Sequence, residues 1–119
     1  MPVEAVLLTP GYFDLDTLRG VGEALNPPLT VVESDSGGYV VFRDFAGEPQ
    51  LTLGRARVVQ SRSDLVRLLG VEARIPEATT AMYEGFIHYY NFRDGSGLRV
   101  LAALEELAGG SLILRGIPQ

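Results

Sequence analysis

The sequence predicts an α+β fold: a single mixed, largely antiparallel sheet of about six strands with two or three helices packed on it. Short runs that alternate apolar and polar residues, as strands do, are interleaved with runs whose apolar residues recur every three or four positions, as in helices. Turn-rich joints between three successive strands favour antiparallel pairing. The expected order along the chain is β-α-β-β-β-α-β-α-β, in one globular domain over residues 1–119.

The first strand is predicted at 3–8, where the apolar run VEAVLL is closed by the turn TPG. A helix follows within 13–26, with Asp14 as its N-cap and apolar residues at helical spacing, and the sequence NPP ends it. Gly20 and Gly22 each cost about 1 kcal/mol relative to alanine inside a helix. We interpret both glycines as positions where the helix lies close to the sheet.

Three successive strands are predicted at 29–34, 37–45 and 50–61. The joints between them, SDSGG and AGEP, are rich in turn-forming residues, so an antiparallel meander is the expected arrangement. Gly54 interrupts the alternation of the third strand, and we interpret it as a bulge at which the facing side changes.

The second half of the chain adds two helices and two strands. A short helix is predicted over 61–70, capped by one of its serines and ended by its glycine. The segment 80–92 carries large apolar groups on both faces of its alternation, which is typical of a central strand. The segment 96–110 is the clearest helix, and 111–117 is the last strand. The stripe expected to face the sheet consists of Val100, Leu101, Leu104, Leu107 and Ala108.

Charge is distributed unevenly along the chain. All ten basic residues are arginines, and the formal net charge is −5. Residues 1–54 carry a net charge of −6, whereas residues 55–119 carry +1. A net-acidic protein repels phosphate backbones, which argues against nucleic-acid binding, and it favours encounter with basic partners.

The chain has one histidine, His88, a residue type that can act as a general base. Glu84 lies on the same face of the predicted strand, but four residues along a strand span about 13 Å. A half-buried sheet histidine is therefore the favoured interpretation. The chain has no cysteine, which excludes a thiol nucleophile, and it has no G-x-S-x-G elbow. We therefore expect no catalytic residues. A pocket formed by Glu84, His88, Tyr90 and Arg93 is kept as the alternative site.

The sequence predicts neither a metal site nor a cofactor site. One histidine without cysteines cannot supply a zinc site. The stretch ESDSGG lacks the further acidic positions of a calcium loop. The turn RDGSG has the placement of a phosphate loop, but Val100 stands where a dinucleotide-binding motif needs its third glycine. A helix N-cap at Asp94 or Ser96 explains this turn without a ligand.

These observations favour a non-enzymatic protein-binding module that inhibits a basic protein. In general build, though in no aligned motif, the chain is similar to small acidic immunity proteins, which implies a toxin domain as the partner. We expect a cytoplasmic, bacterial protein, because no basic leader precedes the short run AVLL and no segment approaches the ~20 apolar residues of a membrane helix. The acidic residues expected to bind the partner are Asp14, Asp16, Glu33, Asp35, Asp44 and Glu48.

Two alternatives stay open from the sequence. One is a small-molecule-binding or catalytic domain with the pocket near His88. The other is a structural homodimer that uses the aromatic strand or an open sheet edge.

Overall fold

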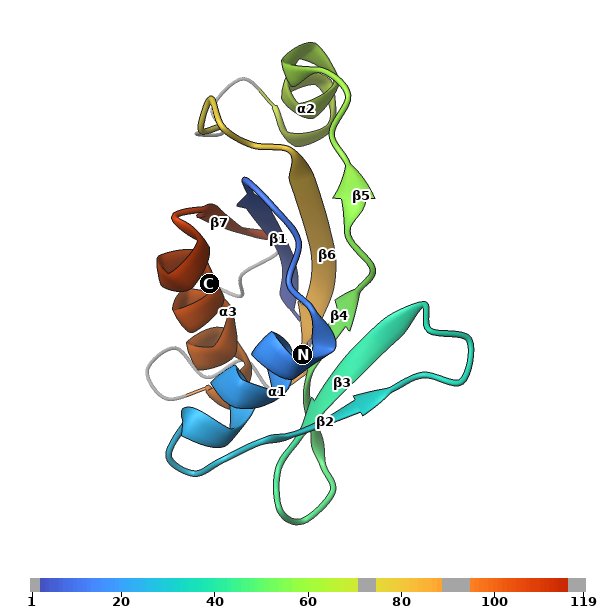
Figure 1. Cartoon of the computed structure of the whole chain (residues 1–119), viewed down its shortest axis with the longest axis vertical. Coiled ribbons are helices and arrows are strands. Elements are labelled where there is room, and N and C mark those ends of the chain that lie inside the picture. The colour runs from blue at the N-terminus through green and yellow to red at the C-terminus, as the bar shows by residue number, and fades with distance from the viewer. Residues whose placement is uncertain (1–2, 71–74, 89–94, 116–119) are drawn as a thin grey trace.

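The computed structural model describes residues 3–70, 75–88 and 95–115 (Figure 1). Its elements confirm the predicted α+β class and the predicted alternation of strands and helices, with the third strand of the meander divided in two. In chain order they are β1 (Val3–Thr9), α1 (Leu15–Ala24), β2 (Thr30–Glu33), β3 (Tyr39–Arg43), β4 (Pro49–Gly54), β5 (Arg57–Val58), α2 (Arg62–Leu69), β6 (Ala81–Ile87), α3 (Ser96–Ala108) and β7 (Ser111–Arg115).

The strands form one sheet in the order β2-β3-β4-β6-β1-β7, and β5 pairs with β6 beyond the end of β4. Every pairing between described strands is antiparallel, so the expectation of a mixed sheet is wrong. The reason lies in the placement of β1. It separates β6 from β7, which therefore run parallel to each other without being neighbours, and α3 crosses from one to the other. The prediction of a central strand is confirmed, because β6 lies between β4 and β1.

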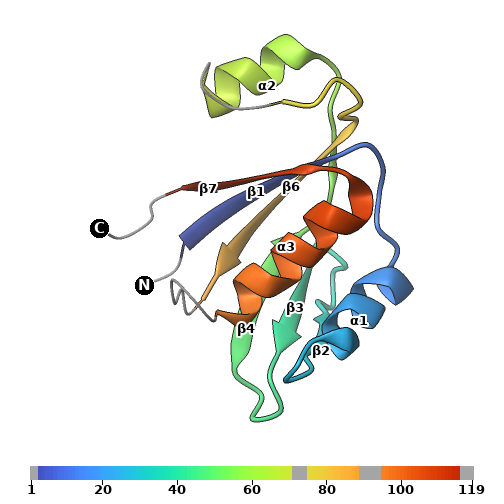
Figure 2. The ribbon, with the colours of Figure 1, turned by 90° about the vertical axis from the view of Figure 1, so that its left-hand side faces the viewer.

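Helices α1 and α3 cover one face of the sheet, and α2 packs on the opposite face at one end (Figure 2). The alternation of β1 shows the two layers directly. Val3, Ala5 and Leu7 point into the main core with Leu104 of α3, whereas Val6 and Leu8 point toward Leu65 of α2. Beyond α2, Phe86 of β6 lies on this second face and is 51% exposed.

The first helix follows its sequence signals. The Asp14 side chain caps it by accepting a hydrogen bond from the Thr17 N–H at 2.7 Å. Gly22 confirms the predicted close approach, because a Cβ there would lie 2.8 Å from the Leu29 carbonyl oxygen. The same interpretation is wrong for Gly20, where a Cβ would meet nothing within 4 Å. Gly20 lies on the outer side of α1, away from the sheet.

A bulge separates β4 from β5, as the glycine in the predicted strand indicated. Leu53 pairs with Gly85 and Arg57 pairs with Met82, so one extra residue is present on the β4–β5 side of this ladder. The side chains change faces as a consequence. Leu53 belongs to the main core, but Arg57 lies on the side of Met82 and α2.

The helix ends differ in how well the sequence predicts them. Ser61 caps α2, as predicted, by accepting a hydrogen bond from the Asp64 N–H at 3.2 Å. The predicted cap at Ser96 is wrong: the N-cap of α3 is Gly95, which makes no side-chain cap bond, and residue 94 lies outside the described residues. Leu107 is exposed rather than buried, because the last turn of α3 lies beside the edge strand β7, where few side chains cover it.

Candidate functional site

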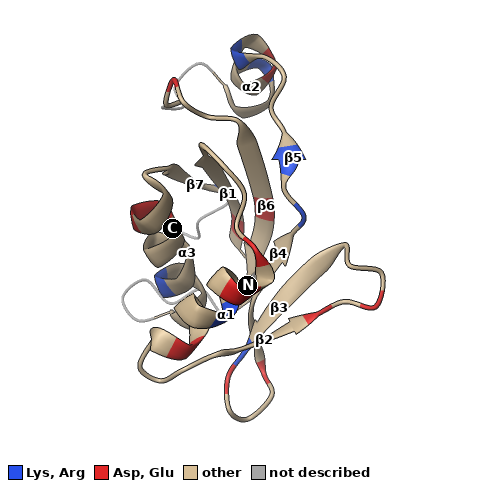
Figure 3. Ribbon diagram, in the orientation of Figure 1, with Lys and Arg blue, Asp and Glu red and all other residues tan. Residues whose placement is uncertain are grey.

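The six acidic residues predicted to bind a partner fall into three pairs. Asp14 and Asp16 lie at the start of α1. Glu33 and Asp35 lie at the turn between β2 and β3, and Asp44 and Glu48 lie at the turn between β3 and β4 (Figure 3). The last two pairs are at opposite ends of β3, so the structure does not bring all six carboxylates into one cluster.

Asp14 has a structural role, which its charge alone does not distinguish from a role in binding a partner. Hydrogen bonds from the Thr17 side chain and backbone hold the pKa of the Asp14 carboxyl below its ordinary value. The carboxylate thus stabilises the first turn of α1, where the helix dipole also favours negative charge.

Asp44 organises the turn between β3 and β4. Its Oδ1 accepts hydrogen bonds from the N–H groups of Ala46 and Glu48, and its Oδ2 accepts one from the Gln50 side chain. The Arg43 guanidinium donates to the Gly47 carbonyl at 2.8 Å, which closes the turn from the other side. These four bonds give a surface turn a defined conformation.

Phe45 stands at the tip of this turn with 93% of its surface exposed. The predicted strand over 37–45 includes Phe45, but β3 ends at Arg43 and the turn begins at Asp44. The signal that could have located it is the aspartate just before the aromatic residue, because Asp side chains commonly hydrogen-bond the backbone two residues ahead and start a turn.

Each acidic pair has an exposed aromatic side chain beside it. Tyr12, 59% exposed, precedes α1, and Tyr39, 47% exposed, follows the turn between β2 and β3. Phe45 lies between Asp44 and Glu48 in the turn that joins β3 to β4. Aromatic residues surrounded by polar and charged ones are the usual composition of protein–protein contact sites. The charges in the sequence do not by themselves reveal that each acidic pair has an exposed aromatic residue beside it.

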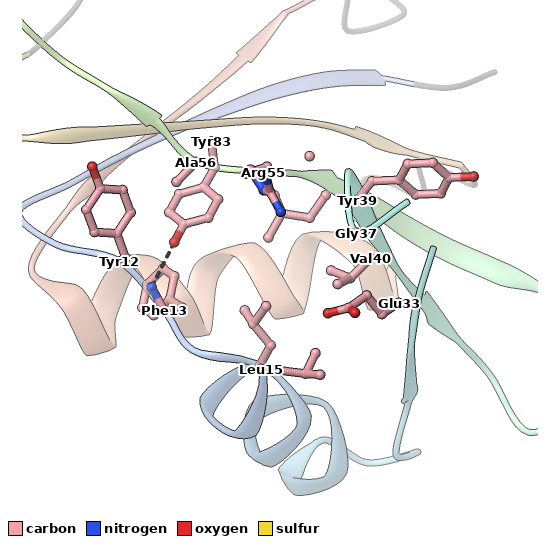
Figure 4. A pocket seen from close by; sticks show the side chains of 13 residues that line it. Tyr12, Phe13, Leu15, Glu33, Gly37, Tyr39, Val40, Arg55, Ala56 and Tyr83 are labelled. Carbon is pink, nitrogen blue, oxygen red and sulfur yellow. Dashed lines mark hydrogen bonds between the residues drawn. The ribbon is translucent and has the colours of Figure 1, made fainter. Parts of the chain in front are cut away.

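A pocket of about 370 Å³ opens between the start of α1 and the turn joining β2 to β3 (Figure 4). One of its walls is fixed by Tyr83, whose hydroxyl oxygen accepts a hydrogen bond from the Phe13 N–H at 2.8 Å. The two rings are in contact, with centroids 5.5 Å apart. Burial raises the pKa of the Tyr83 hydroxyl above its ordinary value, so this group stays protonated near neutral pH.

The alternative site near His88 is only partly described. The His88 Nε2 lies 2.6 Å from the Thr52 hydroxyl oxygen, and Glu84 forms an ion pair with Arg57 at 3.4 Å. Both side chains therefore have partners on neighbouring strands rather than each other. The other two residues predicted for this site, Tyr90 and Arg93, lie outside the described residues.

Within residues 3–70, 75–88 and 95–115, the structure has no cluster of three or more potential metal ligands. Its longest helix in the same ranges, α3, has 13 residues, and none of these helices has the length and apolarity needed to cross a membrane.

Comparison with protein-family models, with curated proteins and with solved structures finds no match.

Proposed function

We propose that this protein is a non-enzymatic binding module that inhibits a basic protein, in the manner of an immunity protein that neutralises a toxin. The observation that carries the proposal is Phe45, a large apolar side chain exposed at the tip of a hydrogen-bonded turn with acidic residues on both sides.

The rigidity of the turn supports a binding role for Phe45. Ordering a loop on association opposes binding, and a turn that is already held by its own hydrogen bonds avoids most of that loss. A phenylalanine on such a turn can enter an apolar pocket of a partner as an anchor, the kind of residue that dominates binding energy in protein interfaces.

The charges around Phe45 indicate the class of partner. Asp44 and Glu48 flank the ring, and Glu33 and Asp35 extend the negative charge to the other end of β3. Negative charge around an apolar anchor favours a positively charged partner and accelerates the encounter with it. A toxin that acts on nucleic acid needs a basic surface, and an acidic protein bound there competes with the phosphates of its substrate.

The test is a pull-down with the tagged full-length chain from a lysate of the native host, washed over a salt gradient. We expect one stoichiometric basic protein that is released at moderate salt. The variant Phe45→Ala should weaken its capture about tenfold or more, since truncation removes the anchor.

Phe86→Ala is the matched control, because Phe86 is 51% exposed but projects from the open face of β6 and not from the turn. Thermal unfolding should be close to wild type for both variants. Recovery of the bait alone would overturn the proposal. Equal capture by wild type and the Phe45 variant would show that the turn is not the contact site.

A further inference from the structure

The pocket at the start of α1 has two opposite charges, of which the proposed function uses only the acidic one, Glu33. Glu33 of β2 and Arg55, just after β4, both line it, and Figure 4 shows their side chains on different walls. Within the described part of the chain, neither side chain takes part in an ion pair. One acidic and one basic group thus line the same pocket without neutralising each other.

Arg55 has an exposed side chain and lies beside the turn between β2 and β3. Its backbone N–H donates to the Gly38 carbonyl at 3.1 Å, and its guanidinium lies 3.5 Å from where a Cβ on Gly37 would be. Gly37 has a φ of 72°, a conformation that favours glycine. The backbone hydrogen bond thus fixes where Arg55 leaves the chain beside the pocket, and its exposed guanidinium lies next to this turn.

The surface between the two charges is apolar and aromatic. Leu15 of α1 lines the side opposite Arg55, and Tyr12 and Tyr83 line another (Figure 4). Leu18 of α1 also lines the pocket. A ligand site typically has this composition, a mostly apolar wall with a few polar groups that fix orientation.

The volume is compatible with a small ligand. A pocket of about 370 Å³ lies at the lower end of the roughly 300–1,000 Å³ that is typical of small-molecule sites. An aromatic amino acid or a small dipeptide belongs to this size class.

We infer that this pocket binds a small zwitterion with an apolar body, such as an aromatic amino acid or a dipeptide. The ligand's ammonium group contacts the Glu33 carboxylate, its carboxylate contacts the Arg55 guanidinium, and its apolar body lies against Leu15, Leu18 and the tyrosine rings. Glu33 and Arg55 are both exposed, so a ligand with a single charge would leave the other charge in water and gain only one of the two charge-assisted contacts. A planar guanidinium is well suited to a carboxylate because it can donate two parallel hydrogen bonds.

The inference is tested on the full chain without any protein partner, so it stands or fails independently of the proposed function. The probes are L-phenylalanine, glycyl-L-phenylalanine, N-acetyl-L-phenylalanine and L-phenylalanine amide, titrated into isotopically labelled protein and followed by amide chemical shifts. We expect saturable shifts at the pocket for the zwitterions. Blocking either ligand charge should weaken binding by up to about fivefold, the usual range for a contact with an exposed charge.

Two variants separate the charges. Glu33→Gln should remove the preference for phenylalanine over its N-acetyl form, and Arg55→Gln should remove the preference over the amide. Asp35→Asn and Arg57→Gln are matched controls, because these neighbouring charges do not line the pocket.

Absence of saturable shifts with both zwitterions would overturn the inference. So would equal binding of blocked and unblocked ligands by the wild-type chain, a comparison that requires no variant to fold. Unchanged preferences in the Glu33 and Arg55 variants would show that the charges do not recognise the ligand.

Discussion

Tyr83 joins the sheet to the segment that leads into α1 through a single hydrogen bond. Tyr83→Phe removes the acceptor of the Phe13 N–H and leaves that donor in a partly buried position. We expect the free energy of unfolding to fall by about 1–2 kcal/mol, the range for a lost hydrogen bond that leaves one group unsatisfied. Urea denaturation measures it, and Tyr12→Phe is the control because the Tyr12 side chain is exposed. Equal stability of the variant and wild type would show that the bond contributes nothing.

The same residue gives the protein a defined response to alkali. Burial raises the folded-state pKa of Tyr83 above its unfolded value of about 10, so its neutral form is the one that the folded state favours. The stability gained from this is fully present below about pH 10 and is lost as pH rises through the folded pKa. One of the five tyrosines should therefore ionise late in an absorbance titration, and Tyr83→Phe should abolish that phase.

At the scale of elements, the two glycines of α1 offer a paired test of helix packing. Gly22→Ala places a Cβ 2.8 Å from the Leu29 carbonyl oxygen and should destabilise the fold by about 1–3 kcal/mol, as overpacking does. Gly20→Ala meets open space and should stabilise it by about 0.5–1 kcal/mol through helix propensity. Thermal unfolding of the two variants measures both effects. Shifts of the same sign would contradict the packing described for Gly22.

Local signals predicted the elements well. The Asp14 and Ser61 caps depend on residues within a few positions of each other, and the structure confirms them. Gly54 marked the bulge after β4, although the bulge itself forms in the pairing with β6. The sheet order depends on β1 pairing with segments more than 70 residues away, which local patterns do not encode. This is why an entirely antiparallel sheet was not predicted.

The candidate site could be predicted from the sequence less completely than the fold. The acidic residues can be counted in the sequence, but only the structure shows that the Asp14 and Asp44 carboxylates accept hydrogen bonds from backbone N–H groups. Glu33 of β2 and Arg55, just after β4, line the same pocket, and their 22-position separation in sequence hides that relation. Exposure of Phe45 depends on where β3 ends, and element boundaries are the least predictable part of a fold.

At the scale of the whole molecule, charge is separated in space as well as in sequence. Acidic residues lie on the turns at both ends of β3, whereas arginines lie along β5 and α2 (Figure 3). A basic partner is therefore attracted to the β2–β4 part of the sheet and repelled from the β5 and α2 part. This separation orients the partner before contact, toward the face that carries Phe45.

The two acidic turns should contribute differently to binding of the proposed partner. They are at opposite ends of β3, about 13 Å apart along the strand, which exceeds the Debye length of about 8 Å at physiological salt. The double variant Glu33→Gln and Asp35→Asn should slow association several-fold at low salt and match wild type at physiological salt, with an unchanged dissociation rate. Phe45→Ala should instead accelerate dissociation with little effect on association, because anchor contacts form after the encounter.

Surface plasmon resonance against the captured partner, at two salt concentrations, separates these rates. Asp44 is left unchanged in this experiment because its carboxylate holds the turn itself. The prediction is contradicted if the double variant dissociates as fast as Phe45→Ala at physiological salt. In that case the turn between β2 and β3 makes direct contact with the partner, and the interface extends along β3 to both ends rather than centring on Phe45.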